Sequence, residues 1–128
     1  MLPGAACLLL ALVYPALVQA QASPQQGRAI VANRQLGLCL LCHSAPIPEE
    51  RFQGNLAPNL QDLVQGKSQA HLRQILQDPS VLRPDTLMPA YGRTEHLQRV
   101  AKSQEGKPLL TSQQIEDVLA YLMSLQQP

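Results

Sequence analysis

Apolar residues recur along this chain at helical spacing. Near the C-terminus, Ile115, Val118, Leu122 and Leu125 lie three or four positions apart, which places them on one face of a helix. No stretch of useful length alternates apolar and polar residues with the period of two that a half-buried strand requires. The pattern therefore predicts an all-α fold, with helices over about 24–36, 59–64, 68–77 and 111–125.

The ends of these helices are marked by residues that favour such positions. Ser23 and Thr111 are each followed three positions later by glutamine, which is the pattern of a capping box. Ser68 is a further predicted N-cap, and Gly37 and Gly66 are predicted to end the helices before them. Prolines keep the connecting stretches irregular, at Pro46, Pro48, Pro58, Pro84 and Pro89.

The first 22 residues carry no charged side chain and contain an apolar run from Ala5 to Val18. This run is too short to span a membrane, which needs roughly 20 apolar residues. Small residues two positions apart predict cleavage after Ala20 or Ala22. We therefore expect a signal peptide over 1–22, an exported domain over 23–128, a periplasmic location and no membrane span.

Composition limits the functions that are open to this domain. The whole chain has three tyrosines, one phenylalanine and no tryptophan, so its own aromatic residues would leave a thin core. A bound apolar group would supply the missing volume. The formal net charge of +1 offers no broad basic surface, and we expect no nucleic-acid partner.

The segment Cys39-Leu40-Leu41-Cys42-His43 has the CxxCH pattern of a c-type haem attachment site. Two residues between the thiols let both sulfurs bond to one haem, and His43 then lies where it can ligate the iron. A thioredoxin-like site would need a preceding strand, and a zinc site would need further paired ligands. A disulfide between Cys39 and Cys42 stays open as an alternative. We expect one covalent haem c, held through Cys39 and Cys42, with His43 as an axial ligand.

Met88 is the predicted second axial ligand of the iron. It lies between prolines in a stretch that cannot form a helix, and such a loop can present a thioether to a metal. Met123 falls on the apolar face of the last predicted helix, where it fits a core position better. His71 and His96 are rival ligands that are expected to be solvated. A His/Met pair favours ferrous iron and leaves no open position for small ligands, as electron transfer requires.

These features, in this order, resemble a class I cytochrome c. A first helix is followed by CxxCH, a late loop carries a methionine, and an amphipathic helix closes the chain. The resemblance implies that the terminal helices cross at Gly27, with Tyr121 against it, around one covalent haem. It also implies that the carbonyl of Pro58 accepts a hydrogen bond from His43 Nδ1 and raises the basicity of the imidazole.

Nearly all of 23–128 is similar to the SoxX family, the small monohaem subunits of SoxAX complexes in sulfur-oxidising bacteria. A segment from Thr94 to Leu110 is longer than a minimal cytochrome needs and is particular to that family. The matching motifs are Phe52-Gln53-Gly54-Asn55, Pro58-Asn59-Leu60, Asp78-Pro79, Pro84 to Tyr91, Arg93-Thr94, Arg99-Val100, Gly106 to Thr111, and Ile115 to Leu122.

This resemblance implies a role in periplasmic thiosulfate oxidation. The partners would be a SoxA-like haem subunit in a heterodimer, a SoxYZ-like carrier whose cysteine is joined to thiosulfate, and a downstream small cytochrome c. The chain would be the electron-accepting, non-catalytic subunit of a SoxAX-type L-cysteine S-thiosulfotransferase, and no catalytic residue is expected in it.

Two other functions compete with this interpretation. A free class I cytochrome c that shuttles electrons to an oxidase or reductase would have the same fold, but only a small polar docking surface. A haem-based gas sensor or peroxidase would need an open iron position, which Met88 would close.

Overall fold

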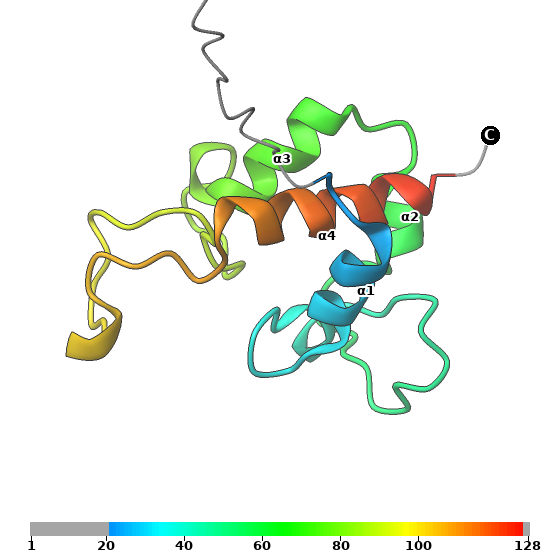
Figure 1. Ribbon diagram of the computed structural model, residues 1–128, viewed down its shortest axis with the longest axis horizontal. Coiled ribbons are helices and arrows are strands. Elements are labelled where there is room, and N and C mark those ends of the chain that lie inside the picture. The colour runs from blue at the N-terminus through cyan, green and yellow to red at the C-terminus, as the bar shows by residue number, and fades with distance from the viewer. Residues whose placement is uncertain (1–20, 127–128) are drawn as a thin grey trace, which may run out of the picture.

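The computed structural model describes residues 21–126 as a small helical domain (Figure 1). Its helices are α1 (Pro24–Ala32), α2 (Leu60–Val64), α3 (Gln69–Gln77) and α4 (Ser112–Ser124). Single 3-10 turns occupy Cys39–Leu41, Pro79–Val81 and Lys102–Gln104, and no strand occurs within 21–126. The all-α prediction is confirmed for this part of the chain. Residues 1–20 of the predicted signal peptide lie outside the described residues.

The predicted caps explain where the helices begin. At α4 the capping box is complete: Gln114 N donates to Thr111 Oγ1 at 3.2 Å, and Thr111 N donates to Gln114 Oε1 at 2.8 Å. At α1, Ser23 Oγ accepts from Gln26 N at 3.2 Å, but the second bond of a capping box, from Ser23 N to the side chain of Gln26, is not made. Ser23 N donates instead to Oδ1 of Asp117 on α4, at 2.8 Å, so the start of α1 is tied directly to α4.

The end of α1 differs from its prediction. The helix stops at Ala32 and not near Leu36, because the side chain of Asn33 accepts hydrogen bonds from the backbone of Gln35 and Leu36, both at 2.9 Å. Asn33 thus offers the backbone a turn in place of another helical turn. Gly37 has a different role from the predicted helix stop: a Cβ there would overlap the carbonyl of Ile30, so only glycine lets the chain pass so close to α1.

Two terminal helices cross at the centre of the core. A Cβ on Gly27 of α1 would overlap the backbone carbonyl of Asp117 on α4 and crowd Cβ of Tyr121, so glycine is what permits this approach. The predicted crossing at Gly27 is confirmed, with Asp117 as the nearer neighbour. Figure 1 shows α4 running between α1 and α3. The fully buried side chains around it are Val31, Leu40, Ile47, Val64, Leu72, Leu110, Val118 and Leu119.

An ion pair joins α3 to the opposite side of α4. Arg73 donates through Nε to Glu116 Oε1 at 2.7 Å and through Nη2 to Glu116 Oε2 at 2.8 Å. This bidentate hydrogen bond lowers the pKa of Glu116, opposed in part by burial. With Leu72 and Leu76 of α3 buried beneath it, α3 is fixed on the core.

Residues 94–109, which we call the arm, leave the body between α3 and α4. Two hydrogen bonds close its base: Tyr91 N donates to the carbonyl of Leu76, and Leu110 N donates to the carbonyl of Tyr91, each at 3.1 Å. Figure 1 shows the arm, in yellow to orange, extending away from the helices. None of its residues is buried, and His96 and Arg99 both have positive φ, a conformation that costs energy in non-glycine residues.

Candidate haem site

The CxxCH segment forms one tight turn directly after α1. Leu38 enters it with φ of 60°, in the left-handed region, and so redirects the chain. Cys42 N and His43 N then both donate to the carbonyl of Cys39, at 3.2 and 2.9 Å. In such a turn, residues three and four positions apart lie on one side. Cys39, Cys42 and His43 are therefore brought together as the spacing predicts.

Both cysteines of this turn are free thiols and half-buried, so they are not joined in the alternative disulfide. Cys39 Sγ donates to the carbonyl of Gly37 at 3.3 Å and lies 4.0 Å from the hydroxyl of Tyr91. Burial raises the pKa of the Cys39 thiol, and the hydrogen bond with Tyr91 partly opposes this rise. The sulfur of Cys39 is thus held by a backbone carbonyl, and the two sulfurs are not bonded to each other.

His43 is oriented by a single short hydrogen bond. Its Nδ1 lies 2.6 Å from the carbonyl oxygen of Pro58. A carbonyl can only accept, so Nδ1 carries a proton, and Nε2 is the nitrogen that is left to face a metal. This is the form of histidine that ligates a metal, and the hydrogen bond makes the free nitrogen a better donor to it. The contact between His43 and Pro58 that the family resemblance implied is confirmed.

The loop that carries Pro58 is itself fastened to the turn. Gly54 N donates to the carbonyl of Leu40 at 2.8 Å, and Ala57 N donates to the carbonyl of Cys42 at 2.9 Å. A side chain at Gly54 would collide with the backbone of Leu41 and Cys42. The orientation of His43 is therefore set by a backbone frame and not by a flexible side chain.

Met88 lies in the loop between Val81 and Tyr91. Its side chain is half-buried and packs against the core, and its N–H donates to Thr86 Oγ1 at 3.2 Å. Met123 also packs half-buried against the core, from α4, as expected for a core position. Among the described residues no hydrogen bond joins Met88 to the CxxCH turn.

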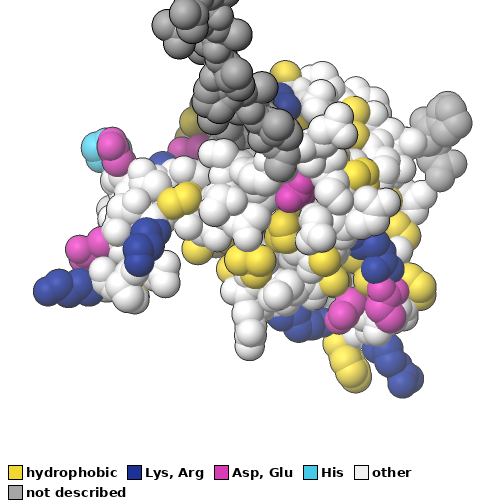
Figure 2. Space-filling model, in the orientation of Figure 1, with side chains coloured by type: hydrophobic (Ala, Val, Ile, Leu, Met, Phe, Trp, Pro, Cys, Tyr) yellow, Lys and Arg dark blue, Asp and Glu magenta, His cyan; other side chains and the backbone are white. Residues whose placement is uncertain are grey.

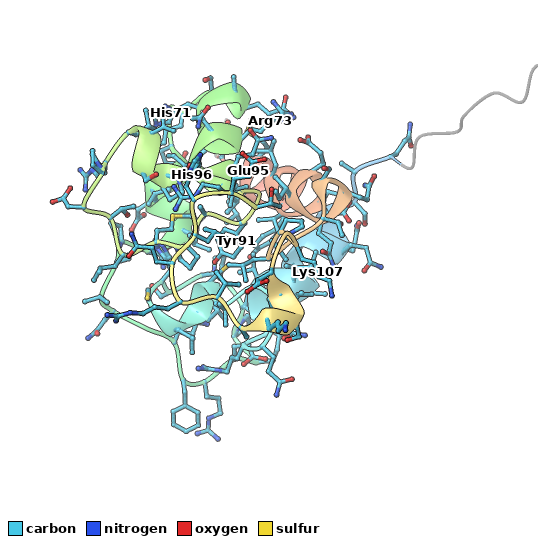
Figure 3. The ribbon with its side chains drawn as sticks, turned by 90° about the vertical axis from the view of Figure 1, so that its left-hand side faces the viewer. His71, Arg73, Tyr91, Glu95, His96 and Lys107 are labelled. Atoms are coloured by element: carbon cyan, nitrogen blue, oxygen red, sulfur yellow. The ribbon has the colours of Figure 1, made fainter. Side chains whose placement is uncertain are left out.

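The two rival histidines are both exposed. His71 lies in the first turn of α3, and His96 lies on the arm; both are labelled in Figure 3. Within 21–126, no group of three or more His, Cys, Asp or Glu side chains is arranged to hold a metal ion. A zinc site built on the CxxCH turn therefore lacks its remaining ligands.

Exposed apolar side chains lie on the CxxCH turn, on the loop fastened to it, and next to Met88 in the chain. Leu41 and Leu56 flank the turn and its fastened loop, and Leu87 precedes Met88 with 86% of its surface exposed. Figure 2 shows yellow side chains gathered on the lower part of the body. An apolar cofactor on the turn would give Leu41 and Leu56 apolar contacts. The free thiols, the oriented imidazole and this apolar rim fit a haem.

Sequence reasoning missed two residues that organise the site. Asp117 is buried on α4, where it accepts from Ser23 N and from Gln113 Nε2 and so closes the helix crossing. Tyr91 is 3% exposed, and its hydroxyl donates to the carbonyl of Gly37 at 2.5 Å. Burial raises the pKa of Tyr91, so it stays a protonated donor. A tyrosine three positions after Met88, in a chain with few aromatics, was the available signal.

Comparison with known proteins finds similarity among solved structures. No protein-family model matches the chain, and no curated protein matches it either. A chain in the crystal structure of SoxXA from P. pantotrophus is similar to it, with 32% sequence identity and a TM-score of 0.74. The similarity covers 90% of this chain and 90% of that chain.

The chain belongs to the SoxX family of cytochromes. The recognition made from the sequence motifs is thereby confirmed, and the helical domain is the small cytochrome fold of that family. In 21–126, no helix is both long and apolar enough to cross a membrane.

Proposed function

We propose that this chain is the electron-transferring haem subunit of a SoxAX-type complex. One haem c is attached through thioethers to Cys39 and Cys42, with His43 and Met88 as the axial ligands of its iron. The observation that carries the proposal is the short bond from His43 to Pro58 on a CxxCH turn, in a chain of the SoxX family. The signal peptide over 1–22 and export to the periplasm belong to the same proposal.

Each protein group has a distinct task at this site. When bound, the haem supplies a one-electron couple between ferric and ferrous iron. His43 offers Nε2 as the nitrogen ligand, because Pro58 holds the proton on Nδ1. Met88 offers a soft thioether, which favours the ferrous state and raises the reduction potential. With both positions filled, small molecules are excluded, and the domain accepts and releases electrons without other chemistry.

The proposed reaction of the complex joins thiosulfate to a cysteine of a SoxYZ-like carrier. One sulfur–sulfur bond forms, the cysteine thiol loses its proton, and the two sulfur atoms together give up two electrons to the haem groups of the complex. A SoxA-like haem subunit holds the reacting sulfur atoms, and the present chain takes the electrons singly and passes them to a small cytochrome c. We assign no catalytic residue to this chain.

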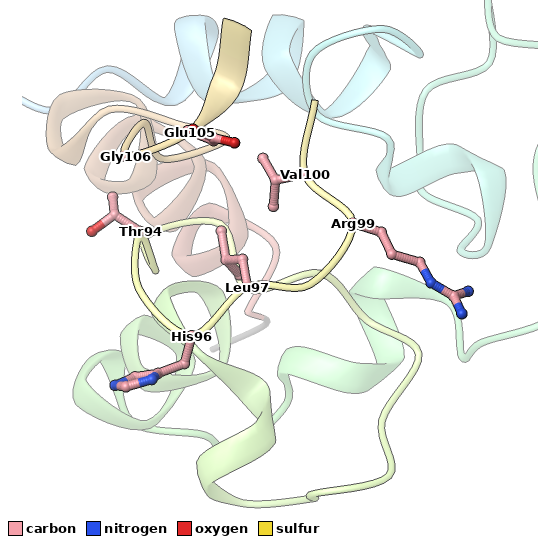
Figure 4. A pocket seen from close by; sticks show the side chains of 7 residues that line it. All are labelled: Thr94, His96, Leu97, Arg99, Val100, Glu105 and Gly106. Atoms are coloured by element: carbon pink, nitrogen blue, oxygen red, sulfur yellow. The ribbon is translucent and has the colours of Figure 1, made fainter. Parts of the chain in front are cut away.

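The geometry of the arm favours a role as a subunit of a stable complex over a role as a free electron shuttle. It is held at its base by Tyr91 and Leu110, and none of its own residues is buried in this domain. A cavity of about 410 Å³ lies between the first part of the arm and Glu105-Gly106. Figure 4 shows Leu97 and Val100 among the side chains that line it. An ordered arm that contributes no core of its own fits a role in contacts with the SoxA-like subunit.

A co-purification experiment tests this function. The full chain is produced with a SoxA-like subunit in a host that attaches haem, and the mixture is run through gel filtration at low and high salt. We expect a stable heterodimer at both, because apolar burial is not screened by salt. The pair should reduce added cytochrome c when thiosulfate and carrier are supplied, and omission of this chain should stop the reduction.

A variant with residues 94–107 replaced by a short Gly/Ser turn provides the matched control. Its base can still close between Tyr91 and Leu110, so we expect its haem spectrum and stability to stay unchanged while the heterodimer dissociates. A chain that stays monomeric at every salt concentration, with no effect of its omission on the reaction, would leave a free electron shuttle as its function.

A further inference from the structure

Tyr91 connects three parts of the chain that are distant in sequence. Its N–H donates to the carbonyl of Leu76 at the end of α3, and its carbonyl accepts from Leu110 N at the base of the arm, each at 3.1 Å. Its hydroxyl donates to the carbonyl of Gly37 at 2.5 Å, across the interior. Figure 3 shows its side chain in the middle of the domain. It lies three residues after Met88.

Gly37 is a fixed point of the scaffold. Its N–H donates to the carbonyl of Asn33 at 2.9 Å, and its α-carbon passes so close to Ile30 of α1 that a side chain would not fit. It also comes two residues before Cys39. The hydroxyl of Tyr91 therefore ties the Met88 loop to the start of the haem-attachment turn.

Two donors share the carbonyl of Gly37 in the free-thiol form. They are the hydroxyl of Tyr91 at 2.5 Å and the thiol of Cys39 at 3.3 Å. A thioether has no S–H, so attachment of haem to Cys39 removes the second donor. Tyr91 then carries the side-chain hydrogen bond to this buried carbonyl alone, and its loss would leave the carbonyl unpaired.

The rest of the Met88 loop is weakly held. Residues 81–85 and Leu87 are exposed, and the hydrogen bond of the Met88 backbone goes only to Thr86, two positions away. Local anchoring of this kind does not fix the loop relative to the CxxCH turn. Tyr91 is the nearest buried residue that does.

We propose that Tyr91 is a positioning residue which, through its hydrogen bond to Gly37, keeps Met88 on the haem iron. The inference rests on the proposed function, since it takes Met88 as the axial ligand. An external ligand binds ferric iron only when Met88 has left it, so the apparent affinity follows the fraction of molecules with an open loop. Removing the Tyr91 hydroxyl should raise that fraction without touching either axial ligand.

Imidazole titration of the purified ferric holoprotein tests the proposal, with optical spectra as the readout. We expect Tyr91→Phe to bind imidazole about five to ten times more tightly than the wild type, the effect of losing one buried hydrogen bond. Tyr121→Phe is the matched control. It removes another buried tyrosine hydroxyl, one without a hydrogen-bond partner, and should leave imidazole binding unchanged. A 4-aminophenylalanine at position 91 keeps an N–H donor and should restore the wild-type affinity.

The outcomes separate this proposal from the iron-ligand assignment on which it rests. Met88→Ala removes the proposed methionine ligand altogether, so its imidazole affinity is that of a fully open site. It should bind imidazole more tightly than every other variant. If Met88→Ala binds no more tightly than the wild type, the ligand assignment and the proposal both fail. If Met88→Ala binds tightly while Tyr91→Phe matches the wild type or Tyr121→Phe, the ligand stands and the positioning role of Tyr91 is refuted.

Discussion

Two sides of this domain hold the proposed haem iron in contrasting ways. On one side, α1 crosses α4 with Gly27 against the backbone of Asp117, and the CxxCH turn follows α1 within a few residues. On the other side, Met88 and the arm lie in irregular chain, where most residues are exposed and Tyr91 is the principal anchor. The side with the helix crossing is held by close packing, whereas the side with Met88 is held at few points.

This difference follows from how the backbone on each side is hydrogen-bonded and packed. The crossing uses helical hydrogen bonds, caps and close packing, which are all internal to the domain. The loop side is fastened at a few points, namely the base of the arm and the ion pair of Arg93 with Asp78, in which Nη1 lies 3.2 Å from Oδ2. We therefore expect changes at the crossing to affect stability and changes on the loop side to affect the haem and its partners.

The largest effect on stability is expected at the crossing. Gly27→Ala should improve helix propensity by about 1 kcal/mol, yet we expect it to lower the free energy of unfolding by about 2 kcal/mol or more, since the methyl group meets the backbone of Asp117. The reverse change Ala29→Gly, at an exposed position of the same helix, should cost only about 1 kcal/mol. Urea unfolding of the two holoproteins measures both, and a Gly27→Ala variant more stable than the wild type would disprove the close crossing.

The two methionines should separate the loop side from the core. We expect Met88→Ala to abolish the weak absorption near the red end of the ferric spectrum, which reports sulfur on iron, and to lower the potential by on the order of 0.1 V, because axial ligands set haem potentials over about 0.8 V. Met123→Ala should keep that absorption and cost about 2 kcal/mol of stability, the low end for a core methionine, since the side chain is half-buried. If the absorption is lost in Met123→Ala and kept in Met88→Ala, then Met123 is the iron ligand and Met88 is not.

The smallest effect is expected at the ion pair between α3 and α4. Because Arg73 lowers the pKa of Glu116, the pair stabilises the fold at neutral pH, and this contribution is lost as pH falls through the folded-state pKa. Glu116→Gln should lower the free energy of unfolding at pH 7 by less than about 1 kcal/mol, since both side chains are about one-third exposed. The difference from the wild type should be smaller at about pH 3, below the ordinary glutamate pKa of about 4.3, than at pH 7.

Glu105→Gln on the arm is the control for that measurement. Its side chain is exposed, and the change should alter stability by less than about 0.5 kcal/mol at either pH. A Glu116 effect that is equally large at both pH values would mean that packing, and not charge, makes the contribution.

Sequence patterns predicted the helical body well because its signals are local. Ser68 and Thr111 cap α3 and α4 as expected, and Gly66 follows α2 with φ of 68°. The short bond between His43 and Pro58 was also anticipated, but from family resemblance and not from spacing. Such features depend on a few neighbouring residues or on a recurrent motif.

The features that escaped prediction depend on long-range contacts. The early end of α1 comes from the side chain of Asn33, which competes with the helix, and the missing half of the Ser23 capping box comes from Asp117, far along the chain. The bond from Tyr91 to Gly37 joins residues 54 positions apart. No local pattern announces such a partner, because each is chosen by the packed fold.

Mass spectrometry can count the haem groups that are covalently attached to the CxxCH turn, where we expect one. The mature protein is exported in a host that attaches haem, then denatured, extracted with acidified acetone and weighed. We expect the mass of the chain plus one haem, and loss of that haem in the double variant Cys39→Ala with Cys42→Ala. A wild-type mass equal to the polypeptide alone, from a folded protein, would contradict it.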